Sequence, residues 1–427
     1  MKKALIICYY WPPAGGPGVQ RWLKFVKYLR EFDIEPVVYI PENPHYPIED
    51  ESLVAEIPNG ISVIKKRIFE PYGIAATFSK SNTRQFSSGI IKTETKQSVL
   101  QRFMLFIRGN FFIPDARKFW INPSVKYLLN YLKANPVDCI ITTGPPHSLH
   151  LIGYKLKRKT GLPWLADFRD PWTEIGYQKK LKLTRFAQKK HQRLEEMVLN
   201  DADHILVTSF ATQSLLEAKT SKPVSCITNG FDEEALPDVA LDKKFSIAHI
   251  GSLLEDRNPK ILWEVLSELK AEIPGFESDL EIHLAGRISA AVIESINAEG
   301  LKNQFVFHDY IAHQEALRMQ RRSQILLLIE IDSLETQLII PGKLFEYLAA
   351  KRPIIAIGPK ESDVKTILEN TKAGSYFQYS HRARLKDELL DLYQNFRSKG
   401  IGKRATDLEP FTRRNLSSQL AAILHRL

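Results

Sequence analysis

The stretch from residue 325 to residue 357 constrains the fold more than any other part of the sequence. The apolar run Ile325–Ile329 predicts a buried strand, and Ile354–Ile357 predicts a second one. Between them, apolar residues recur at helical spacing from Leu344 to Leu348, and Pro353 ends the helix. Two buried strands joined by a helix predict a parallel α/β sheet, because parallel strands need a crossover connection.

The predicted helix carries three candidate ligand-binding residues at its start. Gly342 would let a ligand approach the backbone closely, and Lys343 and Glu346 share a face of the first turn. Free amides and the helix dipole favour an anion at this end, so a lysine beside them suits a diphosphate. A carboxylate one turn further in can accept both hydrogen bonds of a ribose diol. The alternative is a capped helix with a solvated lysine, and spacing alone does not decide between the two.

The first half of the chain opens with a βαβ unit. A strand at Ala4–Tyr10, a loop containing Gly15 and Gly16, an amphipathic helix from Trp22 and a strand at Pro36–Ile40 follow one another. The glycine loop does not match the dinucleotide fingerprint GxGxxG, which argues against a nicotinamide enzyme. Plain turn chemistry is the alternative interpretation of these glycines.

Polar residues follow two further predicted strands in this half. His147 comes after the strand that ends at Thr143, and Arg169 and Asp170 come after the strand that begins at Pro163. Because ligands bind at the carboxyl ends of strands in open α/β sheets, these three residues are candidates for one rim. A structural Arg169–Asp170 pair is an equally open interpretation.

A second βαβ opening follows a linker at 233–244. The strand Phe245–Ile250 leads into a loop with Arg257, and a helix covers Ile261–Leu269. Guanidinium groups bind diphosphates through paired hydrogen bonds, so Arg257 is a candidate anion ligand, with an unpaired surface arginine as the alternative. Two such halves account for a length of 427 residues.

Several segments, in this order, resemble family 4 glycosyltransferases of the GT-B fold, in a bacterial polysaccharide and lipopolysaccharide branch. They are YYWPPAGGPGVQR, TGPPHS with LADFRDPWT, HIGSLLEDRNPKIL and PGKLFEYLAAKRPIIAIGP. The resemblance implies an α/β protein with two Rossmann-like domains facing a central cleft and a C-terminal helix that crosses back to the first domain. The expected parts are an acceptor-side domain at 1–232, a linker at 233–244, a nucleotide-sugar domain at 245–405 and the terminal helix at 406–427.

The resemblance also implies an activity. It predicts transfer of a sugar, with retention of configuration, from a UDP- or GDP-sugar to a hydroxyl of a glycan or lipid-linked acceptor, in cell-surface polysaccharide or glycolipid synthesis. No metal and no other cofactor is expected. The implied donor-binding residues are Gly15, Gly16, Arg257, Gly342, Lys343 and Glu346, and the implied catalytic residues are His147, Arg169 and Asp170.

Three departures from the family pattern keep other functions open. The family pairs its ribose-binding glutamate with another glutamate eight positions earlier, where this chain has Leu338, and Asp332 and Glu335 are the nearest upstream acids. Many members carry a histidine where Arg169-Asp170 stand here, and an arginine where Ser252 stands. A sugar-nucleotide epimerase or an inactive binding or scaffold protein of the same fold are the alternatives.

Charge and cysteine content bear on partners and compartment. The chain has 59 Lys and Arg against 49 Asp and Glu, a formal net charge of +10, which suits phosphorylated substrates or anionic lipid. No long basic run with interleaved aromatics is present, which argues against nucleic acid. Cys8, Cys139 and Cys226 are far apart and form no CxxC motif, as expected in a reducing compartment. We therefore expect a cytoplasmic protein.

One segment suggests contact with a membrane. Residues 100–120 combine phenylalanines with arginines and a lysine, a composition that can rest on the anionic inner face of a cell membrane. Core packing of a bent helix is the alternative interpretation.

Overall fold

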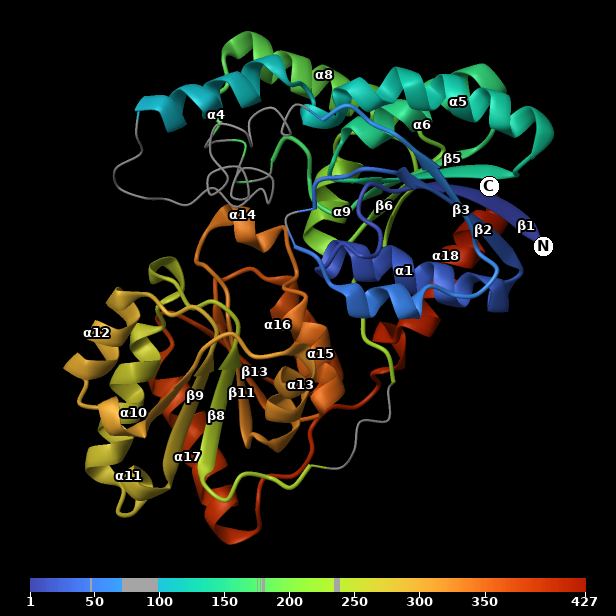
Figure 1. Cartoon of the computed structure of the whole chain (residues 1–427). Helices are drawn as coiled ribbons and strands as arrows, with labels where there is room; N and C mark the ends of the chain where they lie inside the picture. The colour runs from blue at the N-terminus through green and yellow to red at the C-terminus, as the bar shows by residue number, and fades with distance from the viewer. Residues whose placement is uncertain (47, 71–98, 175, 177, 179–180, 234–238) are drawn as a thin grey trace. The chain divides into compact units, whose positions relative to one another are not determined.

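The computed structural model describes the whole chain except residues 47, 71–98, 175, 177, 179–180 and 234–238 (Figure 1). It divides into two compact units. Unit 1 comprises Met1–Asn229 and Arg413–Leu427, and unit 2 comprises Gly230–Thr412. The linker expected at 233–244 falls partly on 234–238, which lie outside the described residues.

Unit 1 contains a seven-stranded sheet in which all neighbouring strands are parallel, in the order β3-β2-β1-β4-β5-β6-β7. The strands are β1 (Lys2–Ile7), β2 (Ile34–Pro41), β3 (Ser62–Lys66), β4 (Cys139–Gly144), β5 (Trp164–Phe168), β6 (His204–Val207) and β7 (Val224–Cys226). The principal helices of the unit are α1 (Pro17–Leu29), α4 (Val99–Phe111), α5 (Ile121–Ala134), α6 (Ser148–Thr160), α8 (Arg185–Asp201), α9 (Phe210–Glu217) and α18 (Arg413–Arg426).

The C-terminal helix α18 packs against α1. Leu420 and Leu424 of α18 share an apolar cluster with Trp22 of α1. The Lys2 ammonium donates to the Leu424 carbonyl at 2.8 Å. Because α18 covers one face of the sheet with α1, the last residues of the chain belong to the unit that its first residues form.

Unit 2 contains a six-stranded parallel sheet in the order β10-β9-β8-β11-β12-β13. The strands are β8 (Phe245–Ile250), β9 (Leu280–Ala285), β10 (Phe305–His308), β11 (Ile325–Ile329), β12 (Ile354–Gly358) and β13 (Gly374–Gln378). The helices are α10 (Lys260–Glu272), α11 (Phe276–Asp279), α12 (Ala290–Ala298), α13 (His313–Arg322), α14 (Leu334–Gln337), α15 (Lys343–Ala350), α16 (Asp363–Thr371) and α17 (Arg382–Ser398), with a short 3₁₀ turn η4 at Glu255–Arg257.

The central strand β11 is covered on both faces, which explains its unbroken apolar sequence. Leu327 belongs to the same cluster as Leu266 of α10, whereas Leu328 belongs to the cluster of Leu344 and Leu348 of α15. Figure 1 shows α10 and α15 on opposite sides of this sheet. The apolar face of α15 therefore anchors the helix on the sheet, with its first residue at the carboxyl end of β11.

Each sheet reverses its strand order at one point. The reversal lies between β1 and β4 in unit 1 and between β8 and β11 in unit 2. In open α/β sheets the carboxyl ends of the strands flanking this point form the ligand crevice. The topology therefore selects the ends of β8 and β11 in unit 2, and of β1 and β4 in unit 1, as the places where functional residues should gather.

Candidate functional site

The carboxyl edge of the unit 2 sheet brings Lys343 onto the backbone of Gly251, the residue after β8. Gly251 has φ +131°, and a β-carbon there would overlap the Lys343 ammonium group. Gly286, after β9, is also close to Gly251, because a β-carbon at position 286 would lie 3.0 Å from the Gly251 carbonyl. Glycine at position 251 therefore makes the space that the lysine head group occupies.

A buried tyrosine fixes the helix that carries this lysine. The Tyr347 hydroxyl accepts a hydrogen bond of 3.0 Å from the backbone N–H of Ile250, the last residue of β8. Tyr347 is fully buried. Since Lys343 lies one turn before Tyr347 on α15, this bond holds the ammonium group at the strand end.

Lys343 is a cation in an unfavourable electrostatic environment. Burial, and to a lesser extent the nearby charge of Arg257, lower its pKa to about 8, and Glu346 opposes both effects. A desolvated ammonium group beside a second cation is stabilised when an anion binds between them. The amino-terminal end of α15 lies at the same place, and the helix dipole also favours an anion there.

Arg257 approaches the same place from the loop after β8. It ends the turn η4, and its Nε is buried without a hydrogen-bond partner among the residues that the structure describes. Two hydrogen bonds fix the loop in place, because Asn258 donates to Ser295 at 2.7 Å and accepts from the Trp263 indole at 2.9 Å. A buried guanidinium N–H that has no acceptor within the described residues can donate to a bound anion.

Glu346 is oriented by a residue that the sequence analysis did not single out. The side-chain amide of Gln320, on α13, donates to Glu346 Oε2 at 2.9 Å. Gln320 is almost fully buried, so its position is fixed by packing. One carboxylate oxygen of Glu346 is thereby held while the carboxylate keeps further capacity to accept hydrogen bonds.

A second carboxyl group, Glu330, was also missed from the sequence. It follows directly on β11 and is 4% exposed. Burial raises its pKa to about 7, and the hydroxyls of Ser362 and Tyr376 lower it in part. The signal was present, since a charged residue ending the run ILLLI stands where parallel strands present ligand-binding groups.

The upstream acids that were considered in place of Leu338 remain without an assigned role. Asp332 is exposed. The side chain of Glu335 lies outside the described part of the chain. Glu330 is thus the acid that the fold buries at the carboxyl end of β11.

In unit 1, Arg169 reaches across the carboxyl edge of its sheet. Its guanidinium donates to the Pro145 carbonyl and lies against Gly18 in the first turn of α1. Its charge also stands 5.8 Å from the centre of the Tyr10 ring. Arg169 therefore joins the loop after β1 to the loop after β4, the place that the strand order selects.

Asp170 is the carboxylate beside this arginine. Desolvation raises its pKa, and the charge of Arg169 opposes the shift. The neighbouring Asp167 is a structural residue, since it is fully buried and bonded to Arg21, Trp22 and Thr143. Asp170 has no hydrogen bond of this kind within the described residues, so its carboxylate is the one available for chemistry.

The structure places His147 inside the protein rather than on an open rim. It is 3% exposed and stacks on Trp172, with ring centroids 4.6 Å apart. Burial lowers its pKa well below the usual value, so the imidazole is neutral. Its catalytic role stays a prediction.

The two glycines predicted for donor binding also lie at the end of β1. The Gly15 N–H donates to the Ile48 carbonyl at 2.9 Å. Gly16 precedes α1 with φ +99°, and a β-carbon there would meet open space. Gly16 is therefore required by the backbone conformation rather than by crowding.

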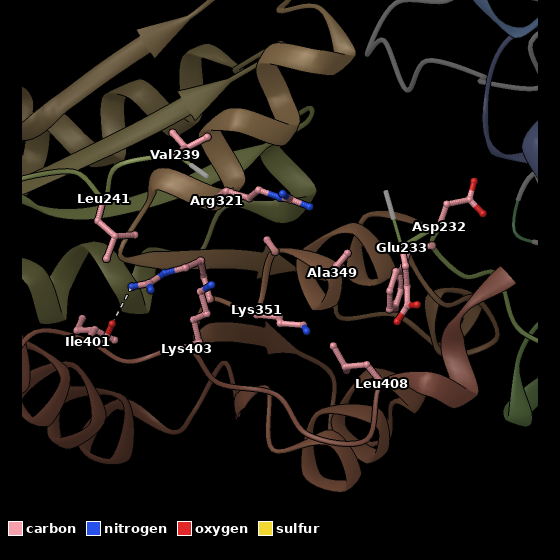
Figure 2. A pocket seen from close by; sticks show the side chains of 13 residues that line it. Asp232, Glu233, Val239, Leu241, Arg321, Ala349, Lys351, Ile401, Lys403 and Leu408 are labelled. Atoms are coloured by element: carbon pink, nitrogen blue, oxygen red, sulfur yellow. Dashed lines mark hydrogen bonds between the residues drawn. The ribbon is translucent and has the colours of Figure 1, made fainter. Parts of the chain in front are cut away.

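A separate cavity of about 540 Å³ lies at the opposite, amino-terminal edge of the unit 2 sheet. Figure 2 shows the side chains that line it, with Lys351 and Lys403 among apolar groups such as Leu408. Its lining includes Glu233 and Val239, which border the residues outside the description. Because Lys351 ends the same helix that Lys343 begins, the two lysines mark opposite edges of one sheet.

Among the described residues, no cluster of three or more His, Cys, Asp or Glu side chains is placed to hold a metal ion. Within the same residues, no helix combines the length and apolar character needed to cross a bilayer.

Comparison with known proteins identifies the fold. A sucrose-phosphate synthase from Thermosynechococcus elongatus aligns with a TM-score of 0.62 and 13% identity over 100% of this chain and 99% of that chain. Anabaena HepE, solved with UDP-glucose, aligns with a TM-score of 0.59 and 13% identity over 100% of both chains. UDP-GlcNAc 2-epimerase from Methanocaldococcus jannaschii aligns with a TM-score of 0.50 and 10% identity, also over 100% of both.

No protein-family model matches the sequence, and no curated protein matches it. The structural likeness over the full length, with two parallel sheets of reversing order, confirms the predicted GT-B fold. At these identities the likeness establishes the fold and leaves the activity to be argued from the site.

Proposed function

We propose that the protein is a glycosyltransferase that moves a sugar from a nucleoside-diphosphate donor to an acceptor hydroxyl with retention of configuration. The observation that carries this proposal is the pair of cations at the carboxyl edge of unit 2. Lys343 is held over Gly251, and the charge of Arg257, whose buried Nε has no hydrogen-bond partner within the described part of the chain, acts on it. HepE, which shares the fold, was solved with UDP-glucose, and this favours a sugar nucleotide as the ligand here.

The geometry suits departure of a diphosphate. As the bond from the sugar to its phosphate oxygen breaks, negative charge grows on that oxygen. Lys343 and Arg257, at the positive end of the α15 dipole, would stabilise this charge. Glu346, oriented by Gln320 at 2.9 Å, would accept hydrogen bonds from the ribose diol and set the register of the nucleotide.

In this proposal, residues of unit 1 bind the acceptor. Arg169 and Asp170 follow β5, and Arg169 reaches the loops after β1 and β4 that the topology selects. Desolvation makes Asp170 a better proton acceptor than an ordinary aspartate. We assign Asp170 to orienting or deprotonating the acceptor hydroxyl and Arg169 to holding an anionic group of the acceptor. Gly15 and Gly16 are proposed as donor contacts, and we include no metal or other cofactor in this reaction.

A transfer assay tests the proposal. Purified protein would be incubated with UDP-glucose, UDP-N-acetylglucosamine or GDP-mannose and a set of glycan and glycolipid acceptors, with release of the nucleoside diphosphate as readout. Acceptor-dependent release that is lost in Lys343→Ala and kept in Lys351→Ala is expected. Equal turnover in the wild type and Lys343→Ala would contradict the proposal.

An epimerase is the second candidate, because an enzyme of that class shares the fold. The same assay separates the two activities. Conversion of UDP-N-acetylglucosamine to an epimer without any acceptor would identify the epimerase, whereas acceptor-dependent product identifies the transferase. Nucleotide binding with neither reaction would identify a binding protein, the alternative that Leu338 raised.

We further propose that unit 1 touches an anionic membrane, consistent with a glycolipid acceptor. Phe103 and Phe111 of α4 are 56% and 64% exposed, whereas Leu105 is buried. The predicted segment therefore turns most of its aromatic residues outward rather than into a core. Lys118 lies over the rings of Phe112 and Phe119, at 5.3 Å and 5.1 Å.

The surface next to these aromatics is basic. The end of α4 is joined to the start of α8, because Asn110 accepts a 2.7 Å hydrogen bond from the Thr184 N–H. Burial and the charge of Lys190, on α8, both lower the pKa of Lys118, so like charges are gathered here. Exposed aromatic rings beside clustered lysines match the interface of an anionic bilayer.

A further inference from the structure

Glu330 makes a set of hydrogen bonds that constrains its protonation. The Ser362 hydroxyl donates to Glu330 Oε2 at 2.7 Å. The Tyr376 oxygen lies 2.9 Å from the same Oε2 and 2.9 Å from the Pro359 carbonyl. The Tyr379 hydroxyl closes the group by donating to the Glu330 backbone carbonyl at 2.6 Å.

Counting protons decides how these contacts can be satisfied. A phenol has a single proton, and the Pro359 carbonyl can only accept. If Tyr376 donates to Pro359, its contact with Glu330 is a hydrogen bond only when Oε2 carries a proton and donates to the phenol oxygen. The protonated acid satisfies both contacts, while a carboxylate leaves one unmade, a cost that is large inside a protein.

Among the described residues, two tyrosines, one acid and one arginine interact electrostatically with the Glu330 carboxyl. Tyr376 faces it from β13 and Tyr379 from the residues after β13, Asp363 faces it from α16, and Arg257 faces it from the loop after β8. Asp363 raises the pKa of Glu330 and Arg257 lowers it, while burial makes the largest contribution and brings it to about 7. Asp332 raises the pKa of Tyr379, and the charge of Arg257 also lowers the pKa values of Lys343 and His249.

Arg257 is the link between this carboxyl and the diphosphate site, because its charge acts on both Glu330 and Lys343. Its Nε is buried and unpaired within the described residues, so an ionised Glu330 and a bound anion would both attract it. A neutral Glu330 leaves the full charge of Arg257 to the anion. An ionised Glu330 competes for it.

We propose that Glu330 is a positioning residue that stays protonated while a nucleoside diphosphate is bound and, when it ionises, draws Arg257 away from that diphosphate. The inference rests on the nucleotide site proposed above. Because the two events are linked, Glu330 takes up a proton when the diphosphate binds near neutral pH. The affinity for the diphosphate therefore falls as the pH rises through neutrality.

Calorimetry with UDP as the probe tests this role. The dissociation constant of UDP would be measured at pH 6 and pH 8 for the wild type and Glu330→Gln. For both proteins, proton uptake at pH 7 would be obtained from the binding enthalpies in two buffers of different ionisation enthalpy. Glutamine keeps the shape of the protonated acid and a donor to Tyr376, and its nitrogen loses only the hydrogen bond that Oε2 accepts from Ser362. For a one-unit rise of the Glu330 pKa on binding, wild-type affinity should fall about fivefold more than that of the variant between these pH values.

Two further variants keep the test decisive. Glu361→Gln makes the same chemical change at an exposed carboxylate near Ser362 and should keep the wild-type pH profile. Ser362→Ala removes a donor to the carboxyl and should move the transition to higher pH, even if Glu330→Gln fails to fold. UDP and Lys343 ionise in every one of these proteins, so their ionisation does not account for a difference between the pH profiles.

The outcomes separate the two proposals. Proton uptake at pH 7 in the wild type that is absent in Glu330→Gln supports the positioning role. UDP binding with the same pH profile in both proteins overturns the role and leaves the nucleotide site intact. No UDP binding by the wild type at either pH overturns the nucleotide site and the role of Glu330 together.

Discussion

The ammonium group of Lys343 occupies the space that a β-carbon at residue 251 would fill. This contact ties the first turn of α15 to the end of β8, and the Tyr347 bond to Ile250 reinforces it. The cation is thereby held at the end of β8, one of the two strands that flank the reversal of strand order in unit 2. The predictions below follow from this arrangement and from the acids near it.

Replacing Gly251 with alanine should displace Lys343 and strain a backbone at φ +131°. We expect a loss of about 1–3 kcal/mol in unfolding free energy from the strain and roughly tenfold weaker UDP binding. Gly300→Ala is the matched control, because Gly300 also has positive φ, +67°, but its β-carbon would meet open space. Equal UDP affinity in the two alanine variants would contradict the role given to the Gly251–Lys343 contact.

Ionisation of Glu330 should make stability depend on pH without any ligand. Its pKa is raised from 4.5 to about 7, so its contribution is fully present below pH 4.5 and is lost as pH rises through 7. Between pH 5.5 and pH 8, wild-type unfolding free energy should fall by about 2 kcal/mol relative to Glu330→Gln. Urea unfolding at the two pH values measures this, and a constant difference would show that Glu330 is ionised throughout.

Asp170→Asn should separate chemistry from donor binding. The change removes a carboxylate whose desolvation favours proton acceptance, and it lies in unit 1, whereas Lys343 and Arg257 lie in unit 2. We expect the transfer rate at saturating donor to fall by about 10²–10⁴-fold, with UDP affinity unchanged. Full turnover by Asp170→Asn would remove Asp170 from the mechanism.

Membrane contact should depend on the outward aromatics of α4. The double variant Phe103→Ser and Phe111→Ser should no longer sediment with vesicles containing anionic lipid, and wild-type binding should weaken with salt. Phe210→Ser, at a residue 41% exposed on α9, controls for the loss of any exposed phenylalanine in the unit. Wild-type protein that stays in the supernatant at low salt would contradict the proposal.

The central strands and their crossover helix were predictable because burial on two faces leaves a strong apolar signal. The run Ile325–Ile329 is a strand with the predicted bounds. The edge strands β3 and β13 were not predicted, because a short strand at a sheet edge carries less apolar sequence. Fold class therefore followed from the centre of each sheet.

The candidate site was predictable in part. Lys343, Glu346 and Arg257 could be proposed from resemblance and from helix and loop chemistry. Gln320 could not, because its importance comes from Glu346, which lies 26 positions away. For Glu330 the sequence carried a signal, a charged residue at the end of a buried strand, but its bonds to Ser362 and Tyr376 depend on the fold. The burial of His147 against Trp172 also depends on packing that no local pattern encodes.

The most direct test of the central claim is UDP affinity, measured by calorimetry, in the wild type, Lys343→Ala and Lys351→Ala. The two lysines stand at opposite ends of α15, one at the carboxyl edge of the sheet and one in the cavity at the amino edge. Loss of one charged hydrogen bond should weaken binding about 10- to 100-fold in Lys343→Ala, while Lys351→Ala keeps wild-type affinity. Wild-type affinity in Lys343→Ala, or an equal loss in both variants, would contradict a diphosphate site at the ends of β8 and β11.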